Sequence, residues 1–140
     1  MNRPVPKWLR VLAWIGVALW TATITILSSL TPPQLDDIAP FQLWDKAAHF
    51  AAFLAGGINL TLALSWSTAW PWKRVILFAV AALAAFGAAD EIHQLYTPNR
   101  SGADPLDWTA DALGALTGTL LTVLIYARYF RPRGPAPAGA

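Results

Sequence analysis

The sequence predicts an all-α polytopic membrane protein, a bundle of four transmembrane helices with both termini cytoplasmic. Three observations support this prediction. The chain has 140 residues, enough for one domain, and 56% of them are hydrophobic whereas only 13% are charged, which lies outside the usage of soluble domains. Four uncharged runs recur along the chain, and most basic residues flank one side of them. We expect one four-helix domain over residues 1–131 and a disordered tail at 132–140.

The first predicted span covers residues 9–30. Its core is an uncharged run of twenty residues from Val11 to Leu30, which is long enough to cross a hydrocarbon layer of about 30 Å. A cleaved signal peptide would have a shorter apolar core, of roughly 7 to 15 residues, so we expect a retained anchor. Trp14 and Trp20 lie inside this span and are predicted to make packing or lipid contacts.

Three further spans are predicted, at residues 46–68, 75–96 and 106–128. The uncharged run behind the second span is long, whereas the runs 75–89 and 112–127 behind the third and fourth are short for a full crossing. These two spans reach full length only if the neighbouring polar residues join the helices as outer turns.

The segments that connect the spans contain helix breakers. Residues 31–40 carry three prolines, so we expect an outer loop that does not continue the helix. Residues 70–74 are predicted to form a tight inner turn. Residues 97–105, with two prolines and a glycine, are predicted to form an outer turn.

The basic residues give the orientation. With four spans, eight of the ten fall on one side: Arg3, Lys7, Arg10, Lys73, Arg74, Arg128, Arg131 and Arg133. Because basic loops stay in the cytoplasm, that side is predicted to be cytoplasmic. The basic residues are thus topology signals and predict no nucleic-acid binding. The absence of cysteine excludes disulfides, thiolate metal sites and a cysteine nucleophile.

Polar residues recur at helical spacing near the outer ends of three spans. Residues three or four positions apart share a helix face, and such pairs are Asp45 and His49, Asp90 and Gln94, and Asp107 and Asp111. We expect these faces to meet in one polar binding cluster. Its other predicted members are adjacent to these pairs or lie in the outer turn: Lys46, Glu91 and Arg100.

Small residues lie deeper on the same three faces: Gly56, Gly87, Gly114 and Gly118. Glycine lets helix backbones approach closely in a membrane, where no hydrophobic force drives helices together. These four residues are therefore predicted to serve helix packing.

The depth of the carboxylates has an energetic consequence. Asp90 and Asp111 lie roughly one turn inside the outer boundary, where an isolated carboxylate costs about 2.5 to 3.5 kcal/mol. Each therefore needs a partner, a proton or a water-filled cavity. The candidate partners are His49, His93, Lys46, Arg100 and Gln94.

Several roles remain open from the residues alone. His49 is suited to proton transfer, or it is simply oriented by Asp45 at a helix start. Glu91 belongs either to the cluster or to a solvated helix end. Arg100 is either an anion-binding group or a loop charge that neutralises the acidic rim. The set is compatible with a divalent metal but does not require one and selects none.

Three motifs in this order resemble those of VanZ-like integral membrane proteins. They are the segments D45-K-A-A-H-F50, D90-E-I-H-Q94, and Arg100 followed by D107-W-T-A-D-A-L-G114. The resemblance covers roughly residues 40–120. One departure is Asp111, where the family pattern usually has asparagine. The resemblance implies a multi-pass protein of the bacterial inner (cytoplasmic) membrane, related to proteins that accompany glycopeptide resistance, particularly to teicoplanin.

Three functional hypotheses follow. In the first, a polar extracytoplasmic site binds a lipid-linked cell-wall precursor, an anionic headgroup of a membrane lipid or a glycopeptide, with an effect on antibiotic susceptibility. In the second, the chain is a small membrane-embedded hydrolase or transferase with a His/carboxylate or metal site. The third is a carrier, which the lack of charge in the inner half of the spans disfavours. The first ranks above the second because no nucleophile is evident, and a homodimer that completes the site is a further expectation.

Overall fold

The structure, a computed structural model, describes residues 5–38 and 45–130. It contains five helices in these ranges: α1 (Lys7–Ser28), α2 (Pro32–Ile38), α3 (Asp45–Ser67), α4 (Trp72–Gln94) and α5 (Pro105–Phe130). The described residues include no β-strand, which confirms the predicted all-α class. The predicted tail at 132–140 lies outside the described residues.

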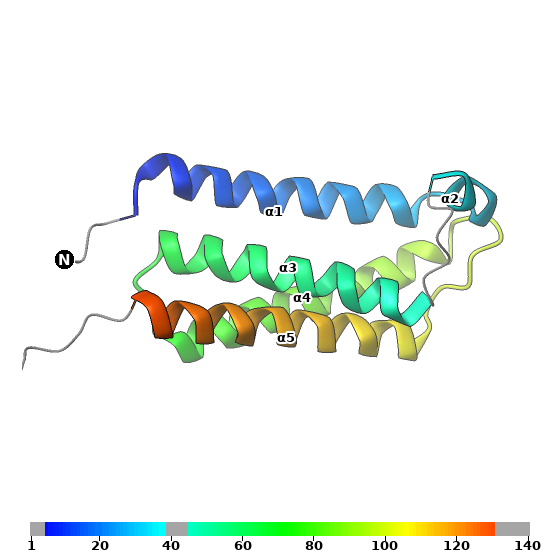
Figure 1. Ribbon diagram of the computed structural model, residues 1–140. Helices are drawn as coiled ribbons and strands as arrows, with labels where there is room; N and C mark the ends of the chain where they lie inside the picture. Colours follow the sequence, from blue (N-terminus) through cyan, green and yellow to red (C-terminus); the bar gives the residue numbers. More distant parts are fainter. Residues whose placement is uncertain (1–4, 39–44, 131–140) are drawn as a thin grey trace, which may run out of the picture.

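Four of the helices are long and apolar enough to cross a membrane: α1, α3, α4 and α5. They match the four predicted spans to within a few residues at each end. In Figure 1 these helices lie side by side with α1 along one flank. Successive long helices run in opposite directions, so α1 and α4 end where α3 and α5 begin. We call this end, which contains Ser28, Asp45, Gln94 and Pro105, the acidic end, and the opposite end the basic end.

The segment 31–40 was predicted as a loop that does not continue the first helix; α1 does end before it, at Ser28, but the short helix α2 within it was not expected. Its first helical positions are Pro32 and Pro33, where the fixed φ of proline suits a helix and no N–H is needed. The side-chain Oε1 of Gln34 accepts a hydrogen bond of 2.9 Å from the backbone N–H of Thr31. This is one half of a capping box, a signal that the sequence T-P-P-Q carries.

The closest helix contact joins α3 and α5, which run parallel. A Cβ atom on Gly114 would collide with the carbonyl oxygen of Phe50, and one on Gly118 with that of Leu54. These two glycines therefore allow backbone contact, as predicted. Gly57 provides the same contact from α3, because a Cβ there would lie 2.5 Å from the carbonyl oxygen of Ala115.

Gly56 and Gly87, also predicted to serve helix packing, meet side chains of other helices. A Cβ on Gly56 would lie 2.5 Å from the ring of Trp20 in α1. A Cβ on Gly87 would lie 2.8 Å from the carboxylate Oδ2 of Asp111. These glycines give room to large or charged side chains rather than to another backbone.

Tryptophans attach α1 to the rest of the bundle. The indole Nε1 of Trp20 donates to the carbonyl oxygen of Ala52 over 2.8 Å, and its ring packs edge-on against Phe53 with centroids 5.3 Å apart. Nearer the basic end, Nε1 of Trp14 donates to the hydroxyl of Ser67 over 2.9 Å. Since hydrophobic driving force is absent between helices in lipid, such hydrogen bonds help to fix the position of α1.

Alanine substitution of Gly118 tests the α3–α5 contact. The new methyl group would meet the backbone of Leu54, which cannot rotate away, so we expect a loss of about 1 to 3 kcal/mol in the free energy of unfolding in detergent. Gly16→Ala is the matched control, because its Cβ would meet only Asn59 Oδ1 at 3.5 Å. Equal stability of the two variants would contradict backbone contact at Gly118.

Candidate functional site

The acidic end holds a polar cluster built from the first turns of α3 and α5, the last turn of α4 and the following loop. Nine predicted site residues lie within this region: Asp45, Lys46, His49, Asp90, Glu91, Gln94, Arg100, Asp107 and Asp111. The structure brings most of them into direct contact through three sets of interactions, described in turn below.

The first set is centred on Lys46, at the start of α3. Its Nζ donates to Asp107 over 2.5 Å and to Asp104 over 2.8 Å. Asp107 is only 3% exposed, so the lysine supplies the charge that its burial requires. Asp104 also accepts a hydrogen bond of 2.8 Å from the backbone N–H of Leu106, which caps the start of α5.

Asp104 was not among the predicted members of the cluster, and its ion pair with Lys46 was not predicted. The hydrogen bond from Lys46 is the main reason that the pKa of Asp104 lies below its ordinary value. The carboxylate therefore remains charged and keeps its partner over the whole neutral range. This ion pair ties the loop after α4 to the start of α3.

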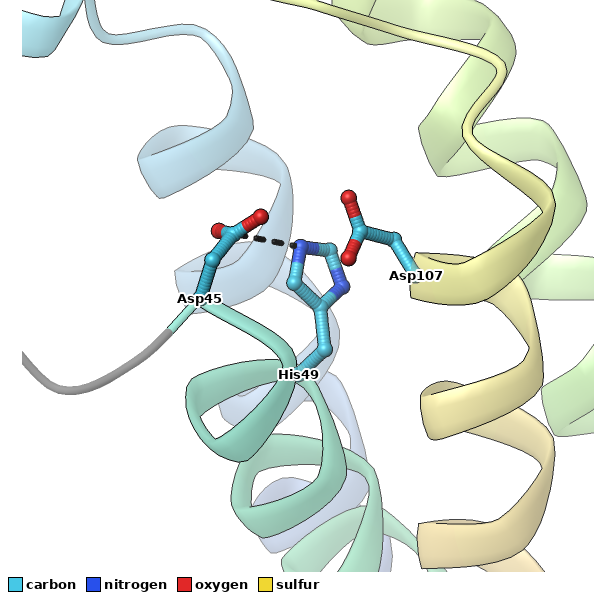
Figure 2. Close-up of side chains that lie close together, drawn as sticks. All are labelled: Asp45, His49 and Asp107. Atoms are coloured by element: carbon cyan, nitrogen blue, oxygen red, sulfur yellow. Dashed lines mark ion pairs between the residues drawn. The ribbon is translucent and has the colours of Figure 1, made fainter.

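The second set pairs His49 with Asp111. The imidazole Nδ1 lies 2.9 Å from Oδ1 of Asp111, which is completely buried. The other ring nitrogen, Nε2, faces Asp45 one helical turn away, with 3.9 Å between Nε2 and Oδ1. Figure 2 shows the ring of His49 between Asp45 of its own helix and Asp107 of α5. Asp45 is mostly exposed, so its hold on the ring is weak.

The third set is a chain of hydrogen bonds across α1, α4 and the loop. Asp90 accepts a hydrogen bond from the hydroxyl of Ser28 over 2.5 Å and one from the amide of Gln94 over 3.0 Å. The amide oxygen of Gln94 in turn accepts hydrogen bonds from Arg100, from Nη2 over 2.7 Å and from Nε over 3.2 Å. The predicted alignment of Asp90 and Gln94 therefore places both groups inside the bundle.

Glu91 is buried at 3% exposure, so the interpretation as a solvated helix end was wrong. Its Oε2 accepts a hydrogen bond of 2.9 Å from the backbone N–H of Asp104. The loop folds back to make this contact, and Gly102 packs so closely on α4 that a Cβ would lie 2.5 Å from the nitrogen of Leu95. Ala103, with a φ of 58°, completes the return.

Ser28 is the functional residue that sequence reasoning missed. The first span was predicted as an anchor, yet its last residue is buried against Asp90. Thr97 reinforces this contact by donating from its hydroxyl to the carbonyl oxygen of Ser28 over 2.9 Å. A serine at the end of an apolar span was the only available signal. His93, in contrast, is exposed and lies apart from these three sets, 3.0 Å from the hydroxyl of Ser29.

A cavity of about 470 Å³ opens between α1, α2, α3, α4 and the loop. Its polar lining comprises Ser28, Asp36, Asp45, His49, Asp90, Gln94 and Arg100. Its apolar lining comprises Ile24, Leu27, Leu35, Ala48, Ala52 and Phe53. Ion pairs within 4.0 Å join Lys46 to three carboxylates, but none joins Arg100 to any described residue. The arrangement thus places one arginine that has no ion pair within 4.0 Å among the described residues, together with three carboxylates, around a space that is part polar and part apolar.

The sequence matches the model of a known protein family. The model for VanZ/LLP1 matches residues 8–126, which include α1, the polar cluster and most of α5. The chain belongs to the VanZ/LLP1 family. No curated protein and no solved structure matches it significantly. The VanZ/LLP1 match confirms the resemblance inferred from the three motifs, and it extends that resemblance to the first span.

Replacing Lys46 with methionine tests the first set of this VanZ/LLP1 protein. The change keeps the length of the side chain but leaves the carboxylate of Asp107 buried without a cation, so we expect the midpoint of thermal unfolding in detergent to fall by several degrees. Adding Asp107→Asn should restore much of the loss. Lys73→Met, at an exposed position of the basic end, is the control. Additive effects of the two cluster substitutions would contradict the pairing.

Proposed function

We propose that this VanZ/LLP1 protein binds a phosphate-bearing envelope lipid, such as a lipid-linked cell-wall precursor, in the cavity at the acidic end, without turnover. The observation that carries the proposal is Arg100. Its guanidinium lines the cavity and, among the described residues, donates side-chain hydrogen bonds only to the neutral amide of Gln94. Arginine presents five N–H donors in a planar fork that matches phosphate oxygens, and most of them stay available here.

The walls of the cavity favour a lipid over a small polar solute. Ile24 and Leu27 of α1 line the cavity together with Ala52 and Phe53 of α3. Ligand sites of this kind bury an apolar body on their walls, and a few polar groups orient the ligand. The polar groups lie at the acidic end and the apolar groups extend toward the interior of the bundle. This order fits a headgroup above a hydrocarbon chain.

The charged residues that line the cavity restrict which lipid headgroups can bind. Asp36, Asp45 and Asp90 line the cavity together with Arg100, so a ligand with only negative charge would be repelled by three carboxylates. A headgroup that carries amino groups beside its phosphate satisfies both signs. Aminophospholipids and peptide-bearing wall precursors share this chemistry. Binding a wall precursor would link the protein to antibiotic susceptibility.

Native mass spectrometry of protein purified gently from a bacterial membrane tests this proposal. We expect wild type to carry a phosphate-bearing lipid, whose mass separates a phospholipid from a polyprenyl-linked precursor. Arg100→Gln should lose most of it, since a charge-assisted hydrogen bond is worth about 1.5 to 3 kcal/mol. Arg128→Gln, an exposed arginine at the basic end, is the control and should retain the lipid. Equal retention by both variants would contradict a role for Arg100, and the same spectra report whether a homodimer forms.

The proposed site requires the acidic end of the bundle to lie at the outer, extracytoplasmic face of the membrane. The concentration of basic residues at the other end supports this orientation. In intact cells, cysteines at the exposed positions Gln34 and Ser101 should react with an impermeant thiol reagent. A cysteine at Lys73 should react only after the cells are opened. The reverse pattern would overturn the orientation and the lipid source named above.

A further inference from the structure

The buried carboxylates of the acidic end outnumber the cations that contact them. Asp90, Glu91 and Asp111 are each less than a tenth exposed, and no lysine or arginine of the described chain lies within 4.0 Å of any of them. Lys46 already forms ion pairs with Asp104 and Asp107. A buried carboxylate without a cation is costly in a membrane bundle. The charge balance of this region is therefore incomplete.

One buried carboxylate oxygen has no hydrogen-bond partner among the described residues. Oδ2 of Asp111 is the buried side-chain oxygen or nitrogen for which the described structure offers no hydrogen-bond partner. It lies above Gly87, close to the position that a Cβ there would occupy. Glu91 lies one turn further along α4, four residues after Gly87, and on the same face of that helix. The unpartnered oxygen of Asp111 and the Glu91 carboxylate therefore both lie on this face of α4. A buried polar atom of this kind calls for a ligand.

We infer that His49, Glu91 and Asp111 bind a divalent first-row transition-metal ion such as Zn²⁺ or Mn²⁺. One ligand atom from each of the three residues lies within 4.8 Å of the other two. Metal–ligand distances for these side chains are about 2.1 Å, so each group needs to move inward by less than about 1 Å. The three residues come from three different helices, α3, α4 and α5, and the ion joins them.

The chemistry of the three side chains agrees with this class of ion. An imidazole nitrogen with two carboxylates suits Zn²⁺ and Mn²⁺, whereas Mg²⁺ and Ca²⁺ prefer oxygen ligands alone. Nδ1 of His49 points toward Asp111 and Nε2 toward Asp45. A metal-bound histidine commonly directs its second nitrogen at a carboxylate, which is the position that Asp45 occupies. Binding through Nδ1 replaces the present hydrogen bond to Asp111.

A second group of possible ligands, Asp45, His49 and Asp107, shares the same histidine (Figure 2). It is the weaker candidate for two reasons. Lys46 already neutralises Asp107 over 2.5 Å, and the side chain of Asp45 is 67% exposed to solvent. The ion is therefore assigned to the buried group.

Metal analysis of the purified protein tests the inference independently of the proposed lipid. Wild type purified in detergent without chelator should contain close to one ion per chain by inductively coupled plasma mass spectrometry. After chelator treatment, returning Zn²⁺ or Mn²⁺ should raise its midpoint of thermal unfolding. Glu91→Gln and Asp111→Asn should each weaken binding by more than about tenfold. The thermal shift uses wild type alone, so it remains decisive if a variant fails to fold.

Two controls decide the position of the ion. Asp37→Asn removes an exposed carboxylate of α2 that belongs to neither group, and Asp107→Asn removes a member of the second group. Both should keep the metal. Metal-free wild type with no thermal shift would overturn the inference, as would unchanged metal content in Glu91→Gln and Asp111→Asn. Loss of the metal in Asp107→Asn alone would assign it to the second group instead and overturn the site stated here.

Discussion

Every polar group that is buried in the membrane needs a partner, and this constraint organises the acidic end. Lys46 donates a hydrogen bond to the buried Asp107, and Ser28 and Gln94 donate hydrogen bonds to Asp90. The backbone of the loop satisfies Glu91 through the N–H of Asp104. Apart from the Gln94–Asp90 hydrogen bond within α4, each of these contacts joins different segments of the chain. The polar cluster therefore holds the bundle together at the end where the helices would otherwise separate.

Glycine packing makes these contacts possible. Gly114 rests on the carbonyl of Phe50, and Phe50 is the residue that follows His49 in α3. Asp111 lies three residues before Gly114 on the same face of α5. The close approach of the two backbones thus sets the distance of 2.9 Å between Nδ1 of His49 and Oδ1 of Asp111. Packing between helices and the geometry of the site form a single constraint.

Periodicity predicted the helices and the convergence of the polar faces, because both depend on spacing along one helix. The alignment of Asp90 with Gln94 on one face of α4 was of this kind, whereas Arg100 lies in the loop and its contact with Gln94 does not follow from helical spacing. Three-dimensional choices were not predictable from spacing. The burial of Ser28 depends on how far α1 leans toward α4, and that of Glu91 on how the loop folds back. The helix α2 is different, since its capping box was present in the sequence and the prolines were read only as breakers.

The two proposed ligands bind neighbouring parts of the cluster, with His49 common to both. Carboxylates concentrate between α3, α4 and α5, where a cation is needed, whereas Arg100 faces the cavity bordered by α1. Of the four long helices, α1 is the least buried, and its contact with α4 is far smaller than its contact with α3. A lipid that reaches Arg100 would therefore enter between α1 and α4. Its passage would separate the hydroxyl of Ser28 from Asp90, so occupancy of the cavity and the position of α1 should be coupled.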